Sequence, residues 1–393
     1  MMRARQAIGS HLSHVWKRLD TARDVRVDKY LVWTFFALVA IGVAAVYSAV
    51  TYLAQQHAGG DTERLLFAHL FRVGLGIGAM MLFSVIDYHI LARWSRYMLM
   101  ASLVLLVFVK LAGMTAGGAT RWLRLGSIGF QPSDLARLSL VLYVAVLLVQ
   151  KQTYIKDFSR AFAPIFFWIL LTAALIGMED LSTAAVLVCT AALMCFIGRV
   201  HLLHLFGLVL MGGLLAYSLI LVSPERAARI ESYLGMKLFP HTQTEHVFDV
   251  RGEGYQQRQA EIAFARGGLI GVGPGKSVQR DFLPASYNDF IYAIIAEEYG
   301  ILGALGLLAL FVVLLVRGFL FVARFARDPL GYMMATGITL MLVLYGFVNA
   351  GVASGLLPVT GLPMPFVSYG GTSLLVTGVM AGILLNISRQ RPR

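Results

Sequence analysis

The sequence predicts an all-α polytopic membrane protein with about ten transmembrane helices. Of its 393 residues, 58% are hydrophobic and only 14% are charged, and the mean hydropathy is +0.73. Apolar runs near the roughly 20 residues that cross a bilayer recur along the chain. Because lipid offers the backbone no hydrogen-bond partners, each run is expected to be a helix.

The apolar runs fall into two blocks, seven within 30–222 and three within 290–387. We predict helices over 30–52, 66–86, 98–111, 135–149, 162–176, 183–197, 205–222, 290–316, 332–354 and 370–387. The polar segment 223–289 separates the blocks and forms one long connection before the eighth helix. Connections of this length are either functional or disordered. Within it, Ile262 and Phe264 among charged residues predict a short amphipathic helix near 256–266.

Basic residues predict the orientation, because Lys and Arg mark the cytoplasmic side of a membrane protein. They gather before the first run, in alternate short connections and after the last run. They are Lys17, Arg18, Arg23, Arg26, Lys29, Arg93, Arg96, Lys151, Lys156, Arg160, Arg199, Arg317, Arg324, Arg327, Arg389, Arg391 and Arg393. Residues 1–29 and 388–393 are therefore expected to be cytoplasmic, and 223–289 extracytoplasmic. The connections 115–133, 178–182 and 355–369 then share the outer side.

Three other features restrict the class of protein. The net charge of +12 is dispersed over membrane-flanking residues instead of forming one basic stripe, which argues against nucleic-acid binding. The first run lacks a small-residue cleavage site, so it is expected to remain as an anchor. Cys189 and Cys195 lie in one run and are expected to be packed or lipid-facing, without a disulfide.

Neither a nucleotide motif nor a metal motif is specific in this chain. Residues 273–277 (GPGKS) resemble the end of a phosphate-binding loop, but Ile270 stands where the loop needs its first glycine. The pairs His201/His204 and His241/His246 lack the spacing of zinc ligands. No metal site is predicted from these residues.

Asp289 stands at the mouth of the eighth apolar run, in the stretch LPASYNDFIYAIIAEEYG. A carboxylate at a water–lipid boundary is costly to desolvate, so chemistry explains it better than stability. Asp289 is therefore the main candidate for a catalytic residue. Of the two acids that follow, Glu297 lies nearer the helical face of Asp289 than Glu298 does.

Basic, amide and acidic groups beside glycines recur on the outer connections. Arginine forks and helix N-termini suit phosphate oxygens, so the set predicts an anionic, hydroxyl-rich ligand. Taken singly, headgroup contacts for the arginines and a helix cap for Asp134 are simpler explanations. Arg137 and Lys276 are expected near the aqueous boundary. The candidate binding residues are Arg121, Trp122, Gln131, Asp134, Arg137, Lys276, Gln279, Arg280 and Asp281.

Three further candidates lie at or inside the membrane. Arg72 falls within the second run, where a guanidinium either faces a cavity on the route of a lipid substrate or snorkels to the outer interface. Ser368 and Tyr369 precede two glycines at the entry of the last helix. That entry suits a close backbone approach to a ligand, although a simple turn explains the glycines equally well.

Four motifs resemble the SEDS family (shape, elongation, division and sporulation), and the similarity covers nearly the whole chain. They are GGATRW at 117–122, QPSDLAR at 131–137, the run GYQQRQAEIAFARGGLIGVGPGKSVQRDFLPASYNDFIYAIIAEEYG at 254–300, and LPVTGLPMPFVSYGGTSLL at 357–375. The residues SVQ at 277–279 favour the division branch of the family over the elongation branch.

The chain departs from the family pattern in three places. Tyr287 and Asn288 replace a His-Thr pair before the catalytic Asp, and residues 177–182 (GMEDLS) replace a Gln-Pro-Asp-Leu-Gly connection. Asp134 and Arg137 replace a Glu and a Lys, and a guanidinium is not interchangeable with an ammonium. These changes concern substrate contacts and leave the reaction class unaffected.

The resemblance implies a peptidoglycan glycosyltransferase that polymerises lipid II on the outer face of the bacterial cytoplasmic membrane during division or elongation. Asp289 would be the general base for the acceptor hydroxyl, and one carboxylate suffices because polyprenyl pyrophosphate is a good leaving group. Basic residues would stabilise the leaving charge. No cofactor is certain, but a divalent cation, Mg²⁺ or Mn²⁺, is an alternative source of that charge, with Asp281 or Glu298 as candidate ligands. The basic candidates are Arg121, Arg137, Lys276 and Arg280.

The resemblance also implies partners. The chain has no Ser-x-x-Lys motif, so peptide crosslinking is expected from a class B penicillin-binding protein. Membrane lipids and other division or elongation proteins are further expected partners. One alternative function is a transporter that flips the lipid-linked precursor, placed second because the polar residues gather on the outer side and not at the midplane. Another is a scaffold, in which Asp289 would be replaceable.

Overall fold

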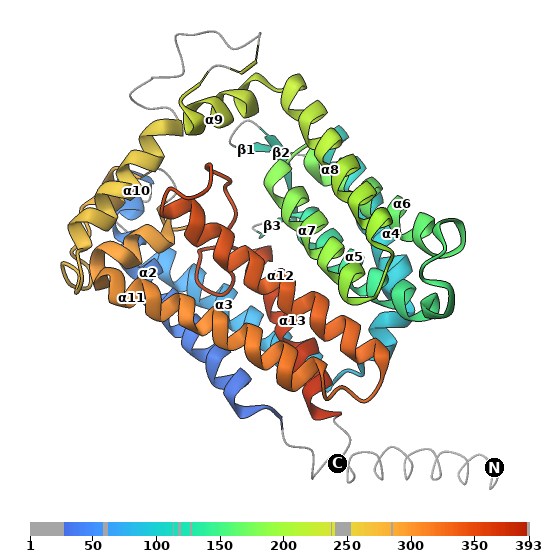
Figure 1. Cartoon of the computed structure of the whole chain (residues 1–393). Coiled ribbons are helices and arrows are strands. Elements are labelled where there is room, and N and C mark those ends of the chain that lie inside the picture. The colour runs from blue at the N-terminus through green and yellow to red at the C-terminus, as the bar shows by residue number, and fades with distance from the viewer. Residues whose placement is uncertain are drawn as a thin grey trace, which may run out of the picture.

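A computed structural model describes residues 27–57, 62–112, 114–116, 119–125, 128–236, 238–239, 253–283 and 286–390. This part of the chain is a bundle of helices with one small sheet (Figure 1). Its helices are α2 (Lys29–His57), α3 (Thr62–Val85), α4 (Tyr88–Ala112), α5 (Pro132–Gln150), η2 (Gln152–Tyr154), η3 (Phe158–Phe162), α6 (Ala163–Gly177), α7 (Leu181–Ile197), α8 (Leu202–Val222), α9 (Pro224–Leu234), α10 (Glu253–Gly267), η4 (Gln279–Asp281), α11 (Ile291–Val316), η5 (Arg317–Ala323), α12 (Pro329–Ala353) and α13 (Thr372–Arg389).

The predicted membrane fold is confirmed. Among the described residues, nine helical stretches are long and apolar enough to cross a membrane, and α7 is a shorter apolar helix. Each of the ten predicted helices coincides with one of these. The largest difference is α4, which begins at Tyr88 and not at 98, because Arg93 and Arg96 interrupt the apolar run without interrupting the helix.

A small antiparallel sheet occupies the outer connection between α4 and α5, where no strands were predicted. It consists of β1 (Met114–Ala116), β2 (Ala119–Leu125) and β3 (Ile128–Phe130), in the order β1-β2-β3. Met114 pairs with Trp122, and Leu123 pairs with Phe130. The sheet lies beside the start of α5.

The connections predicted to be cytoplasmic meet at one end of the bundle. Arg317 pairs with Asp28 at 2.5 Å, and His89 contacts Asp328 at 2.6 Å. At the other end, Arg226 of α9 donates to the carbonyl oxygen of Met178 at 2.6 Å. These contacts agree with the predicted grouping of those connections, and the full alternation and the end that faces the cytoplasm stay predictions.

Helices α3 and α13 pack closely because glycines remove side chains from their interface. A Cβ atom on Gly378 would lie 2.1 Å from the carbonyl oxygen of Gly76, and one on Gly382 would lie 2.6 Å from that of Met80. Small residues allow such backbone approach between membrane helices. The packing fixes the outer half of α3 beside the segment that leads into α13.

The long polar segment 223–289 contains helical structure. Helix α9 follows α8 directly, and α10 confirms the short helix predicted near 256–266. Helix α10 packs against the first half of α11, where a Cβ on Gly267 would lie 2.0 Å from the carbonyl oxygen of Ala296. The segment therefore folds back on the helix that it precedes.

Candidate functional site

Asp289 lies just before α11, and the backbone around it is held by the segment 361–369. The Asn349 side chain of α12 donates to the carbonyl oxygens of Asp289 at 2.9 Å and of Leu362 at 2.7 Å. The Ser368 hydroxyl donates to the carbonyl oxygen of Asn288 at 2.6 Å. These bonds fix the Asp289 backbone between α11 and α12.

The carboxylate of Asp289 faces Gly361. A Cβ atom on Gly361 would lie 3.5 Å from Asp289 Oδ2, and Gly361 has a φ of +70°, which favours glycine. Burial raises the pKa of the neighbouring Tyr287 phenol, and the negative charge of Asp289 raises it further. Tyr287 therefore keeps its proton at neutral pH and is not a competing base.

An aromatic cluster connects this site to α3. The Tyr369 ring packs edge-on against Tyr287, with ring centroids 5.5 Å apart, and stacks on His69 at 5.2 Å. The Arg72 guanidinium lies 4.7 Å from the centre of the Tyr369 ring, a cation–π contact. Of the predicted residues, the structure thus brings Arg72 against Tyr369, while Tyr369 and Ser368 contact residues 287 and 288, directly before Asp289.

Asp134 and Arg137 form a buried pair at the start of α5. Arg137 Nη2 lies 3.1 Å from Asp134 Oδ1, and only 5% and 7% of the two side chains are exposed. Thr372 of α13 donates to Asp134 Oδ2 at 2.9 Å, and the Arg137 guanidinium lies over the Tyr345 ring. The expectation that Arg137 lies near the aqueous boundary is wrong, because α12 and α13 cover the first turn of α5. Gln131 precedes this helix and is half-buried.

The segment 271–283 is fastened to α11 and α2. Glu297, fully buried on α11, accepts hydrogen bonds from the Ser277 hydroxyl and from the backbone N–H groups of Val278 and Gln279. Arg280 donates to the carbonyl oxygen of Ser48 on α2, at 3.1 Å. The Arg280 side chain and the Gln279 backbone are thus engaged within the protein, whereas the buried side-chain oxygen of Gln279 has no hydrogen-bond partner among the described residues.

The remaining predicted residues of this segment differ in exposure. Lys276 is exposed, as expected. Asp281 lies 3.5 Å from Arg280, and Glu298 accepts a hydrogen bond from Ser48. Among the described residues, His, Cys, Asp and Glu side chains do not gather in groups of three or more that would hold a metal ion. The role of a divalent cation stays a prediction.

Arg121 and Trp122 lie on β2, and their side chains fall outside the described part of the chain. Nothing in the structure bears on their predicted contacts.

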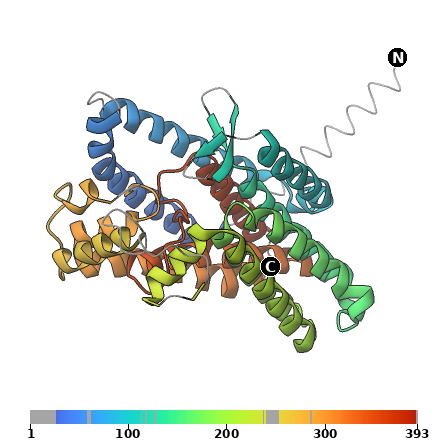
Figure 2. The ribbon, with the colours of Figure 1, turned by 90° about the horizontal axis from the view of Figure 1, so that it is seen from above.

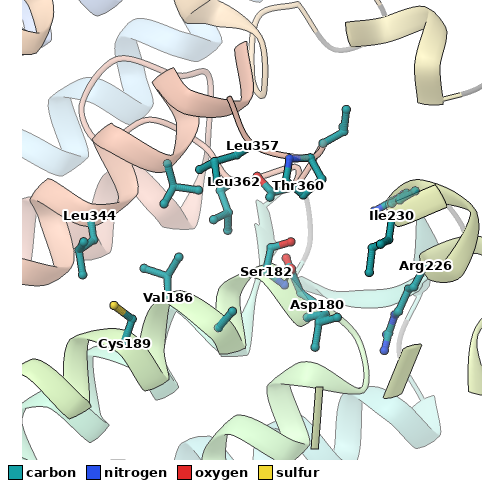
Figure 3. A pocket seen from close by; sticks show the side chains of 16 residues that line it. Asp180, Ser182, Val186, Cys189, Arg226, Ile230, Leu344, Leu357, Thr360 and Leu362 are labelled. Atoms are coloured by element: carbon teal, nitrogen blue, oxygen red, sulfur yellow. Dashed lines mark hydrogen bonds between the residues drawn. The ribbon is translucent and has the colours of Figure 1, made fainter. Parts of the chain in front are cut away.

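A cavity of about 370 Å³ lies beside the Asp289 site, between α7, α9, α12 and the segment 357–362 (Figure 3). Thr360 and Leu362, on either side of Gly361, line it, so the cavity wall and the Asp289 carboxylate share one stretch of backbone. Arg226 and Arg229 of α9 also line it, and the remaining lining is mostly apolar. A cavity of this kind suits a ligand with an anionic group and an apolar part.

Sequence reasoning missed Arg226, Arg229 and Asp180 as lining residues of this cavity. The two arginines stand three residues apart directly after the seventh apolar run, which places them on one face of α9. That spacing was the available signal. Asp180 accepts hydrogen bonds from the backbone N–H groups of Ser182 and Thr183, and so caps α7.

Comparisons with known proteins agree with this fold. The family model for FtsW, RodA and SpoVE, described as a cell cycle protein, matches residues 29–393. The chain is 37% identical over 378 residues to a probable peptidoglycan glycosyltransferase FtsW of Geobacter metallireducens, covering 94% of this chain and 97% of that one. It is 36% identical over 374 residues to stage V sporulation protein E of Bacillus subtilis, covering 94% and 99%.

Two solved structures share the fold. A chain of a peptidoglycan synthase complex, studied for the coordination of polymerization and crosslinking, has a TM-score of 0.72 and 27% identity, covering 93% of this chain and 98% of that one. The crystal structure of the Thermus thermophilus rod shape determining protein RodA has a TM-score of 0.67 and 26% identity, covering 94% and 98%. This chain therefore belongs to the FtsW/RodA/SpoVE family and is a multi-pass membrane glycosyltransferase.

Proposed function

We propose that this chain polymerises lipid II into peptidoglycan glycan strands on the outer face of the bacterial cytoplasmic membrane, with Asp289 as the general base. The observation that carries the proposal is the position of Asp289: its carboxylate lies against Gly361, whose neighbours line the cavity. Curated relatives named peptidoglycan glycosyltransferase support the reaction class.

The proposed chemistry needs one carboxylate. The acceptor sugar hydroxyl attacks the anomeric carbon of the donor, Asp289 accepts the hydroxyl proton, and the polyprenyl pyrophosphate leaves as the new glycosidic bond forms. A second carboxyl acid is unnecessary, because a pyrophosphate leaves without being protonated, unlike the alcohol in glycoside hydrolysis.

We assign the pyrophosphate to basic groups at the cavity. Arg226 and Arg229 line it, and Lys276 is exposed on the segment that leads to Asp289. Preorganised cations lower the energy of a transition state in which such a charge develops. Mg²⁺ or Mn²⁺ is the alternative source of positive charge. Arg137 and Arg280, paired inside the protein, are proposed as positioning residues.

We further propose that a class B penicillin-binding protein crosslinks the product. A structural neighbour comes from a peptidoglycan synthase complex that combines polymerization and crosslinking. The present chain supplies only the polymerase in this proposal.

The test is glycan synthesis from labelled lipid II by the purified chain together with its transpeptidase partner. Asp289→Asn should lower the rate by roughly 100- to 10,000-fold, the usual contribution of a general base, because an amide does not accept the proton. Glu261→Gln, an exposed acid on α10, is the matched control and should keep wild-type activity. Polymerisation by Asp289→Asn at the wild-type rate would exclude Asp289 as the base. Wild-type protein that makes no polymer yet speeds lipid II across vesicle membranes would favour the transporter.

A further inference from the structure

Helix α11 is broken at Gly300, and the turn that follows α10 supplies hydrogen-bond partners for the backbone groups at the break. Gly300 has φ +70° and ψ −173°, outside the helical region. The N–H groups of Ile301 and Leu302 bond instead to the carbonyl oxygens of Gly268, at 2.9 Å, and Leu269, at 3.3 Å. A Cβ on Gly300 would lie 2.3 Å from the Leu269 carbonyl oxygen, so only glycine permits this pairing.

The residues that follow this turn also pair with α11, on the N-terminal side of the break. The N–H group of Val272 donates to the carbonyl oxygen of Glu297, and that of Gly273 donates to the carbonyl oxygen of Glu298, both at 3.0 Å. Leu269, whose carbonyl oxygen accepts the bond from Leu302, and Ile270 form the tip of a turn that we call the Leu269–Ile270 turn. The backbone on both sides of the tip is hydrogen-bonded, as non-helical backbone at membrane depth requires.

The break also marks where α11 enters the membrane. The apolar stretch Ile291–Ala323 has 33 residues. At 1.5 Å per residue it is about 50 Å long, well beyond the roughly 30 Å of a bilayer core. The acids Glu297 and Glu298 precede Gly300, and the next charged residue is Arg317. The membrane-embedded part therefore begins near Gly300, level with the Leu269–Ile270 turn.

The tip presents large apolar side chains away from the bundle. Leu269 is 69% exposed and Ile270 is 81% exposed, next to Leu302 of α11 at 65%. Both ribbon views place α10 and the yellow-to-orange chain after it at the edge of the molecule (Figures 1 and 2). The tip thus continues the lipid-facing surface of α11 at the level where the membrane begins.

We propose that the Leu269–Ile270 turn inserts into the acyl region of the leaflet on its side of the membrane and anchors the segment 271–289 at a fixed depth. Lys276, beyond the tip, is an exposed basic residue suited to the headgroup level, whereas Arg266, before the tip, lies 3.6 Å from the Glu297 carboxylate. The occupant of this surface is lipid. The proposal rests on the membrane fold alone, so it does not depend on the reaction assigned to Asp289.

The test places a fluorescent reporter at the tip. The full chain carries Cys189→Ala and Cys195→Ala, and Ile270→Cys is labelled with an environment-sensitive dye after reconstitution into phosphatidylcholine vesicles. Doxyl groups on the lipid acyl chains should quench this reporter, and aqueous iodide should not. Lys276→Cys, six residues further along the segment, is the matched control and should show the opposite pattern. Leu269→Cys provides a second reporter in case Ile270→Cys fails to fold.

Two results would overturn the proposal. Iodide quenching at position 270 as strong as at position 276 would place the tip in water. A tip reporter that neither quencher reaches would indicate that protein, such as a second copy of the chain, covers the turn.

Discussion

At the scale of single residues, the charged groups beside the catalytic candidate are mostly paired with one another. The Asp134–Arg137 pair is buried between α5, α12 and α13, and Thr372 joins Asp134 to the start of α13. Burying one charge is costly unless it is paired, so the two residues depend on each other. We therefore interpret Arg137 as a positioning residue that aligns the outer ends of these helices beside Asp289.

This interpretation predicts unequal effects of two substitutions at one position. Arg137→Gln should destabilise the protein by about 3–5 kcal/mol, because it leaves the Asp134 carboxylate buried without its cation. Arg137→Lys keeps the charge but loses the planar guanidinium that lies over the Tyr345 ring, so it should cost less stability than Arg137→Gln and retain part of the polymerisation. Thermal unfolding in detergent, together with the polymerisation assay, measures both effects.

A double variant distinguishes positioning from direct substrate binding. Asp134→Asn combined with Arg137→Gln removes both charges and should recover part of the lost stability and activity. If the double variant regains stability but remains inactive, Arg137 contacts the substrate and our interpretation is wrong.

Sequence reasoning identified Asp289 but not the surroundings of the charged residues. Asp289 was recognisable because a carboxylate at the mouth of an apolar run is rare on physical grounds. The burial of Arg137 could not be recognised from the sequence, because Thr372, which holds its partner Asp134, lies 238 residues beyond Asp134 in the chain. Arg226 and Arg229 were missed because the segment 223–289 was interpreted as one polar connection without a helix at its start.

At the scale of elements, the described residues 253–283 before α11 are attached to that helix and do not form a free loop. The helix near 256–266 was predictable from apolar residues among charged ones. The attachment of this segment to α11 was not predictable, because the bonds to Glu297 and across the break at Gly300 join residues about 20 to 35 positions apart. Glu297 holds residues 277–279, ten residues before Asp289 in the sequence.

Glu297→Gln should weaken the attachment of residues 277–279 to α11. An amide at that position places a donor where three donors already converge, and a hydrogen bond to a charged group contributes about 1.5–3 kcal/mol. Amide hydrogen exchange over 277–283 should therefore become roughly ten- to a hundredfold faster, with a parallel loss of polymerisation. Glu261→Gln on the neighbouring helix is the control and should leave exchange unchanged. Unaltered exchange in Glu297→Gln would show that the segment is held by other contacts.

At the scale of the whole molecule, hydropathy alone predicted the ten helices. Most of the connections are short, so sequence order largely decides which helix ends lie together. The cavity beside Asp289 was not predictable, because it forms between α7, α9 and α12, whose packing depends on side chains far apart in sequence. The same packing brings Asp289, Arg72 and Tyr369 to one end of the bundle.

The orientation of that end in the membrane is the last prediction. If the Asp289 end faces outward, where lipid II is polymerised, a cysteine at Lys276 should react with an impermeant thiol reagent added to intact cells. A cysteine at Lys156, exposed in the connection between α5 and α6, should react only after permeabilisation. Both variants carry Cys189→Ala and Cys195→Ala, and equal labelling of the two in permeabilised cells verifies that each thiol is accessible. The reverse pattern would place Asp289 on the cytoplasmic side and contradict a polymerase that works on the outer face.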